Sequence, residues 1–367
     1  MQRCFHFVVV LLLAVIALCL ASEAEARSNR VQLRLDTSQA EAVLAALDKQ
    51  ASGGIIAERD WQAIFASEPY VRLKQREQGF NRTFSEEDFK AFVSAGKFAG
   101  TPDELRRTLD EWKKADLAAL AEQILMWLPE TAHIKATIYP VIKPQNNSFV
   151  FELSTNAAVF LYLDPKVARA QFENIAAHEL HHVGFSSVAS QYDATISTLP
   201  EGAKRAAKWV GAFGEGFAVL AAAGSTEVHP HASSAPEDRS RWDRDMLNFN
   251  QDLRKVENFL LDVTDNKLTK AAERNRAMSF FGDAQGAWYT VGYRMAVVVE
   301  KRFGRAALID CMLDPRKLLH LYNTAAEAHN RSHQDKLELW SSDLLNRLSA
   351  STVSTEAQSN QPSPAGD

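Results

Sequence analysis

Hydrophobic residues recur three or four positions apart over most of the chain, which is the period of an amphipathic helix. From Val31 to about Pro129 this spacing runs through segments that end at glycine, proline or a capping residue. It returns over 246–281 and over most of 295–322. The pattern predicts a helical N-terminal region, residues 27–129, and a second half of the chain that is also largely helical.

The hydrophobic period changes after Pro129. Short runs rich in β-branched and aromatic residues follow, separated by proline, asparagine and serine. These runs are Ile134–Tyr139, Val141-Ile142, Ser148–Glu152 and Val159–Leu163. They predict a small β-sheet directly before the next helix, and therefore an α+β fold in which helices predominate.

The helix expected after this sheet carries the residues with the clearest chemistry. It contains His178-Glu179-Leu-His-His182, an HExxH pattern. Histidines four positions apart lie one turn apart on the same helix face, so both can bind one metal ion. Glu179 lies about 100° around the helix, where a carboxylate can take a proton from a metal-activated water. The alternative is that both histidines are ordinary residues of a helix.

A catalytic zinc ion usually has three protein ligands and one open position. Glu215 lies alone in an apolar helical segment of small residues, where a carboxylate is costly unless it is paired or binds a metal. Glu201 follows Pro200 at a predicted helix start, a place that the helix dipole alone favours for an acidic residue. We therefore expect Glu215 to be the third ligand. Glu201 is the first alternative, and His229 or His231 the second.

The residues after His182 exclude one subclass of HExxH peptidase. A metzincin would continue with glycine at 185 and histidine at 188, but this chain has Phe185 and Val188.

His178-Glu179-x-x-His182 followed by Gly214-Glu215-Gly216 resembles the gluzincins, the peptidase clan that binds zinc through two histidines and a downstream glutamate. The segment Tyr289-Thr-Val-Gly292 is similar to the Tyr-x-x-Gly segment of gluzincin aminopeptidases. The overall arrangement also resembles a family of exported zinc-dependent peptidases. The resemblance implies a zincin-like metallopeptidase domain over residues 130–348 that acts on a peptide or protein.

The same resemblance implies a role for each matching residue. His178, His182 and Glu215 would bind Zn²⁺, Glu179 would be the general base and acid, and Tyr289 would donate a hydrogen bond to the oxyanion. Tyr293, one turn further along, could take the role of Tyr289. The chain lacks the Gly-x-Met-x-Asn element of the aminopeptidases before the metal helix, which argues against an exopeptidase that recognises an N-terminal amine. Peptidases of this layout bind an extended substrate along an edge strand beside the metal helix.

Composition bounds the partners and the location of the protein. The formal net charge of −5 gives no electrostatic reason to expect a nucleic-acid partner. Residues 1–26 have the layout of a signal peptide, with Arg3, an apolar run and a small-x-small site that ends at Ala26. We therefore expect export to the periplasm or the extracellular space, with no stable membrane insertion after cleavage. An uncleaved anchor is the alternative, and Leu18 is too large for lipidation at Cys19.

Cleavage after Ala26 would leave Cys311 as the remaining cysteine, so the exported protein would have no internal disulfide. Residues 349–367 are rich in serine, threonine, glutamine and proline and predict a disordered tail. Together these features predict a secreted zinc-dependent peptidase. An exported binding or scaffold protein with a structural zinc site is one alternative, although such a site does not need Glu179. A zinc hydrolase of a non-peptide amide or ester is another.

Overall fold

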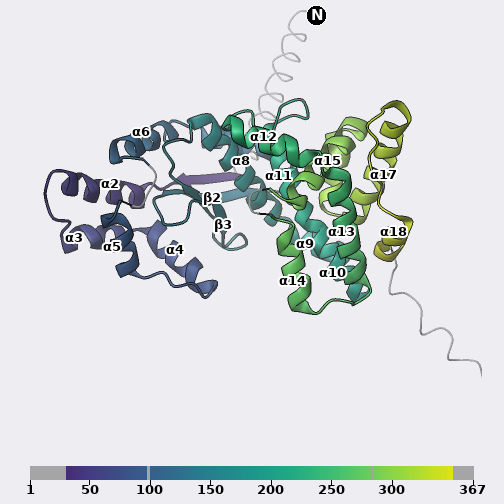
Figure 1. Cartoon of the computed structure of the whole chain (residues 1–367), viewed down its shortest axis with the longest axis horizontal. Coiled ribbons are helices and arrows are strands. Elements are labelled where there is room, and N and C mark those ends of the chain that lie inside the picture. The colour runs from purple at the N-terminus through teal and green to yellow at the C-terminus, as the bar shows by residue number, and fades with distance from the viewer. Residues whose placement is uncertain (1–29, 97–99, 283–284, 350–367) are drawn as a thin grey trace, which may run out of the picture. The chain divides into compact units, whose positions relative to one another are not determined.

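The computed structural model describes residues 30–96, 100–282 and 285–349 (Figure 1). Within these residues helices predominate, and one four-stranded sheet precedes the HExxH helix, so the predicted α+β class is confirmed. The predicted signal peptide and nearly all of the predicted C-terminal tail lie outside the described residues. Among the helices that are described, none has both the length and the apolar character needed to cross a membrane.

The chain divides into two compact units. Unit 1 comprises Met1–Val188 and Ala221–Arg239, and unit 2 comprises Ala189–Leu220 and Ser240–Asp367. Helix α11 (Gly214–Ala223) belongs to both units, because its last three residues are part of unit 1.

Unit 1 contains the sheet, whose strand order is β1-β2-β4-β3. Strands β1, β2 and β4 are parallel, whereas β3 pairs antiparallel with β4 and forms one edge. The strands are β1 (Val31–Leu35), β2 (Ile134–Val141), β3 (Phe149–Phe151) and β4 (Ala158–Tyr162).

Strand β1 shows that the expectation of helix from Val31 onward is wrong for the first five residues. Its sequence VQLRL alternates partly buried and exposed positions, which is the period of a strand. It pairs with β2 from Val31 opposite Ile134 to Leu35 opposite Ile138. The partner strand is about a hundred positions away in the sequence, so the pairing that stabilises this short segment is not visible in its local pattern.

Six short helices lie between β1 and β2 in the sequence. Side-chain caps begin some of them: Ser85 accepts a hydrogen bond from the backbone of Asp88, and Thr101 and Glu104 form a capping box. The six helices are α2 (Ser38–Ala51), α3 (Glu58–Phe65), α4 (Glu68–Gly79), α5 (Glu86–Ser94), α6 (Pro102–Trp112) and α7 (Leu117–Leu125).

Two helices pack on opposite faces of the sheet. Leu73 of α4 packs in one buried cluster with Tyr139, Val141 and Phe160. Helix α8 (Arg169–Ser186) packs near Ile134, whose side chain lies on the other face of β2 because side chains alternate along a strand. The sheet thus supports the helix that carries the HExxH residues.

Helix α8 continues through Gly184 and ends at Ser186. A Cβ atom at Gly184 would lie only 2.3 Å from Cδ1 of Leu128. Gly184 therefore allows α8 to pack closely on its neighbours in unit 1, rather than ending the helix.

Unit 2 is helical and is organised around α15 (Ala287–Phe303), which packs against α13, α16 and α17. Trp288 of α15 is buried among Phe213, Phe259 and Phe280, and its indole donates a hydrogen bond to the carbonyl oxygen of Ala277 at 2.9 Å. The other elements that lie wholly or partly in unit 2 are α9 (Ala189–Ile196), α10 (Glu201–Val210), η1 (Gly211–Phe213), α11, α12 (Pro236–Met246), α13 (Phe249–Thr264), α14 (Lys270–Ser279), α16 (Arg305–Met312), α17 (Pro315–Ser332) and α18 (Ser342–Ser349).

Candidate metal centre

His178 and His182 lie one turn apart on α8, and both are half-buried. Their Nε2 atoms are 3.0 Å apart, and their rings are nearly perpendicular, with an interplanar angle of 81°. A tetrahedral zinc ion with bonds of about 2.05 Å separates its ligand atoms by roughly 3.3 Å. The two imidazole nitrogens are therefore close to the spacing that one shared zinc ion requires.

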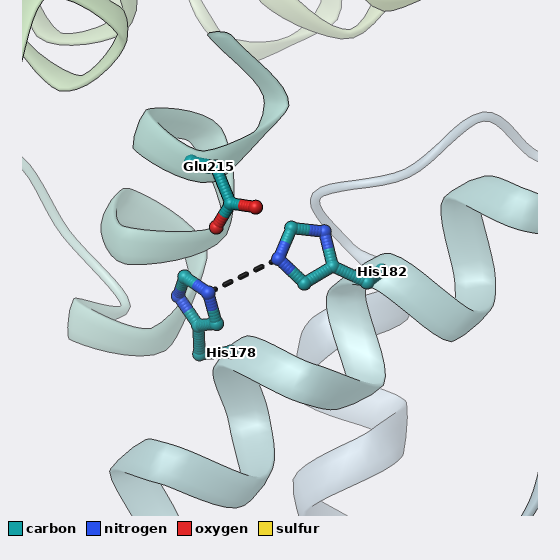
Figure 2. A group of neighbouring side chains, drawn as sticks. All are labelled: His178, His182 and Glu215. Atoms are coloured by element: carbon teal, nitrogen blue, oxygen red, sulfur yellow. Dashed lines mark hydrogen bonds between the residues drawn. The ribbon is translucent and has the colours of Figure 1, made fainter. Parts of the chain in front are cut away.

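Glu215 of α11 completes a group of three potential ligands with these histidines. Each residue offers one ligand atom, and the three atoms all lie within 4.8 Å of one another. Figure 2 shows the carboxylate directed toward the two imidazole rings. Over the described residues, no other set of three histidine, cysteine, aspartate or glutamate side chains meets this spacing.

The competing ligand candidates do not belong to this group. Glu201 is exposed and is the first residue of α10, as a helix-start glutamate would be. His229 and His231 lie in the segment before α12, where the backbone N–H of His231 donates to Nδ1 of His229 at 3.0 Å. Glu215 is thus the glutamate that the structure brings to His178 and His182.

A hydrogen bond joins α8 to the end of α11 that belongs to unit 1, and the sequence analysis did not identify it. The side-chain amide of Asn174 donates to the carbonyl oxygen of Ala222 at 3.1 Å. Asn174 lies one turn before His178 on the same face of α8, and Glu215 lies about two turns before Ala222 on α11. In the sequence, the sign of this contact was Asn174, a polar residue one turn before His178 on the same helix face.

The glycines on either side of Glu215 have different environments. A Cβ at Gly216 would lie 2.0 Å from the backbone nitrogen of Tyr293 and 2.3 Å from the carbonyl carbon of Gly292. A Cβ at Gly292 would lie 2.6 Å from the carbonyl oxygen of Phe213. A Cβ at Gly214 would have nothing within 4 Å. In unit 2, therefore, α11 and α15 cross with their backbones in contact next to Glu215.

Tyr289 and Tyr293 lie on α15 at this crossing, one turn apart. Tyr293 is only 9% exposed, and its ring packs edge-on against Trp242 with centroids 5.2 Å apart. Tyr289 is half-buried and lies near Phe281, with ring centroids 6.3 Å apart. Both tyrosines belong to the stretch of α15 that contacts the turn bearing Glu215, but Tyr289 is the more accessible.

The remaining residues of the HExxH pattern lie on different sides of α8. Glu179 is half-buried and directly follows the first histidine, about 100° around the helix. His181 is almost fully buried and faces away from the partly exposed side of the helix. Glu179 is therefore the residue of this helix that can act on a water molecule near the metal.

Two imidazoles and one carboxylate form the donor set of catalytic zinc sites, in which the fourth position is left open for water or substrate. Ligand type and spacing thus both fit Zn²⁺. An α+β fold whose sheet precedes an HExxH helix, with a glutamate brought to its two histidines, places this chain in the class of proteins built to bind a zinc ion.

The comparison with protein families agrees with this class. The family described as "Putative zinc dependent peptidase (DUF5700)" matches residues 61–331, about three quarters of the chain, and this chain is a member of that family. No curated protein and no solved structure matches the chain. The predicted zinc cofactor is in keeping with the family description and with the His178, His182 and Glu215 group.

Proposed function

We propose that this protein is an exported peptidase of gluzincin type, in which His178, His182 and Glu215 bind a catalytic zinc ion. The observation that carries the proposal is the approach of Glu215 to the two histidines. Its helix is otherwise apolar, and a carboxylate placed there lowers the stability of the fold unless it is paired or binds a metal. Glu179, between the two histidines in the sequence, then has a chemical role that a purely structural site would not need.

The residues around the metal would share the work of hydrolysis. When bound, zinc would supply Lewis acidity to a water and to the scissile carbonyl. Glu179 would accept a proton from the water as the water oxygen bonds to the carbonyl carbon, and would pass that proton to the leaving nitrogen as the C–N bond breaks, giving a carboxylate and an amine. Tyr289 donates a hydrogen bond to the carbonyl oxygen as it gains negative charge. We assign this role to Tyr289 because the ring of Tyr293 is buried against Trp242.

Strand β3 is the edge of the sheet that we assign to the substrate. It is antiparallel to its neighbour β4 and contacts α8 within unit 1. Phe149 and Phe151 lie on the sheet face that packs around Phe160, so Val150 points to the face on which α8 packs. An extended peptide could add to β3 through backbone hydrogen bonds, and Val150 would then lie beside its side chains.

The proposal is tested by replacing Glu179 with glutamine and measuring cleavage and zinc content together. Purified protein would be incubated with unlabelled proteins and peptide libraries, and the products identified by mass spectrometry. We expect Glu179→Gln to keep its zinc and to lose at least about a hundredfold in cleavage rate, as loss of a general base does. Glu173→Gln is the matched control, because Glu173 lies on the same helix and pairs with Arg169 at 3.5 Å.

Three outcomes would reject the proposal. One is cleavage by Glu179→Gln at the rate of the parent protein. Another is a zinc-loaded parent protein that cleaves no peptide but hydrolyses amide or ester probes included in the library, which would assign the site to a non-peptide hydrolase. The third is that no probe is cleaved and chelation unfolds the protein, which would give the zinc a structural role.

A further inference from the structure

A groove between α15 and α17 lies within unit 2 and plays no part in the proposed hydrolysis. Its volume is about 410 Å³, inside the roughly 300–1,000 Å³ range of small-molecule pockets. The lining residues are Arg294, Val297, Val298, Lys301 and Arg302 from α15, and Ala325, Ala328, His329, Ser332 and His333 from α17 and the residue that follows it.

The lining positions form one face of each helix. On α15 they fall at intervals of three, four, seven and eight residues from Arg294, and on α17 at the same intervals from Ala325. The floor is apolar, since Val297 and Ala325 are buried and Val298 and Ala328 are half-buried. The small alanine side chains leave the space that the groove encloses.

The groove is strongly cationic although the whole chain carries a net negative charge. Its lining contains three permanently charged side chains, those of Arg294, Lys301 and Arg302, and it contains no carboxylate. One acidic residue, Asp335, lies at the end of the groove near Arg294, at 3.6 Å, and near His329, at 3.5 Å. The residues that line the groove therefore carry more positive than negative charge around the apolar floor.

Two imidazoles add hydrogen-bonding groups to the same groove. The rings of His329 and His333 stack with centroids 4.0 Å apart and an interplanar angle of 5°. Nδ1 of His333 lies 2.9 Å from the hydroxyl of Ser332. Nε2 of His329 faces the carbonyl oxygen of Asp335 at 3.0 Å, so Nε2 of His333 and the hydroxyl of Ser332 are the groups that can bind an oxyanion at this end of the groove.

We propose that this groove binds an anionic amphiphile with a single aliphatic chain. Its phosphate or carboxylate head would lie among the basic side chains, where charge-assisted hydrogen bonds are strongest. Its chain would lie along the floor formed by Val297, Val298, Ala325 and Ala328, removing apolar surface from water. A small inorganic anion would leave that floor exposed, and a neutral amphiphile could make no charge-assisted hydrogen bond to the basic side chains.

The test is isothermal titration calorimetry of the zinc-loaded full chain with four probes kept below their critical micelle concentrations. Octyl phosphate and octanoate carry both features of the ligand, octyl glucoside lacks the charge, and inorganic phosphate lacks the chain. We expect saturable binding of one octyl phosphate or octanoate per chain, at least tenfold tighter than either single-feature probe. Extending the chain by two methylenes should tighten binding about tenfold.

Charge reversal locates the site. Lys301→Glu combined with Arg302→Glu should weaken octyl phosphate binding at least tenfold, and both residues are exposed, so the variant should fold. Arg331→Glu is the matched control, because Arg331 is an exposed residue of α17 outside the groove lining. Circular dichroism would verify that all variants keep the helical content of the parent.

Three results would overturn the inference. Equal affinity for octyl phosphate and inorganic phosphate would mean that the apolar floor contributes nothing. Equal affinity for octyl phosphate and octyl glucoside would mean that the cations contribute nothing. Unchanged binding by the double variant of Lys301 and Arg302 would place the probe elsewhere, including at the zinc ion.

Discussion

Replacement of Gly216 by alanine would disturb the metal centre without altering any ligand. Gly216 follows Glu215 directly, and its α-carbon faces the backbone of α15 in unit 2. A Cβ at this position would lie 2.0 Å from the nitrogen of Tyr293, whereas ordinary contacts begin at 3.4 Å. The neighbouring atoms are backbone, which cannot rotate away as a flexible side chain can. Helix α11 must therefore shift by about 1 Å or more relative to α15.

This shift has two measurable consequences. Overpacking of this kind typically costs about 1–3 kcal/mol of folding stability, which exceeds the gain of up to about 1 kcal/mol from replacing a helical glycine by alanine. Metal–ligand distances tolerate only about ±0.2 Å, so a displaced Glu215 would no longer reach the ion from its present position. We expect zinc affinity to fall by at least the roughly 10–100-fold seen when residues that support a ligand are changed.

Gly214→Ala is the matched control, since it changes the glycine on the other side of Glu215. Its Cβ would have nothing within 4 Å, and its φ angle of −51° is ordinary for a helix. We expect Gly214→Ala to bind zinc like the parent and to be as stable or more stable, by up to about 1 kcal/mol. Zinc affinity would be measured by competition with a chromophoric chelator, and stability by thermal unfolding of the chelated form.

The reasoning fails if Gly216→Ala binds zinc and unfolds like the parent. It also fails if Gly214→Ala loses zinc to the same extent as Gly216→Ala, because the effect would then come from the loss of a glycine and not from the contact with α15.

Other consequences concern the buried charges of unit 1 and the metal. Lys143 is 1% exposed, and burial, reinforced by the charge of Arg76, lowers its pKa to about 7. Between pH 7 and 10.5 the unfolded chain therefore binds more protons than the folded protein, so the unfolding free energy should rise across this range, by a few kcal/mol at most. Denaturant titrations of Lys143→Met should not show that rise. Arg72 is buried and donates to Glu152 at 2.8 Å and to the carbonyl oxygen of Asn156, so Arg72→Leu should lower the unfolding free energy by about 2 kcal/mol, and an unchanged denaturation midpoint would contradict this. At a free zinc concentration 100-fold above the dissociation constant, bound zinc should raise the unfolding free energy by about 2.7 kcal/mol, and removal of zinc by a chelator should take this away. Equal melting of the zinc-loaded and chelated forms would contradict zinc binding to the folded state.

The HExxH helix could be predicted because its information is local. His178 and His182 share a face because of helix geometry alone, and the β-rich runs before them predicted the sheet. Glu215 could be proposed as the third ligand because an acidic side chain in an apolar helix is costly and because catalytic zinc needs a third protein ligand. The sequence could not show the fold that brings this carboxylate to His178 and His182.

The features that could not be predicted depend on contacts between distant segments. Strand β1 forms through pairing with β2, and Gly184 lies within a helix at a position where Leu128 and Ile134 leave no room for a Cβ atom. Gly216 and Gly292 belong to motifs that are visible in the sequence. The reason for a glycine at each position, a backbone contact between α11 and α15, is visible only in the packed structure. Glycine in a sequence indicates conformational freedom or close approach, and only the fold distinguishes the two.

Outside the metal centre, hydrophobic spacing did not predict the contacts that charged side chains make. From residues 31–129 the hydrophobic spacing predicted helices and no contact with the strands that follow. In the structure, Arg72 of α4 reaches the loop after β3 through Glu152 and Asn156, and the ring of Phe149 in β3 lies 3.5 Å from the guanidinium carbon of Arg76. These contacts hold β3, the strand along which we propose that the substrate binds. They depend on charged and polar residues, whose partners a hydrophobic pattern does not predict.

The most direct test of the account is the zinc stoichiometry and affinity of three proteins, measured by metal analysis at controlled free zinc. The parent should bind one zinc ion per chain with a coordination of two imidazole nitrogens and a carboxylate, visible in X-ray absorption. Glu215→Ala should bind zinc at least tenfold more weakly, and Glu201→Ala should match the parent. Zinc binding by Glu215→Ala with the affinity and coordination of the parent, or loss of zinc from Glu201→Ala, would contradict the assignment of the third ligand.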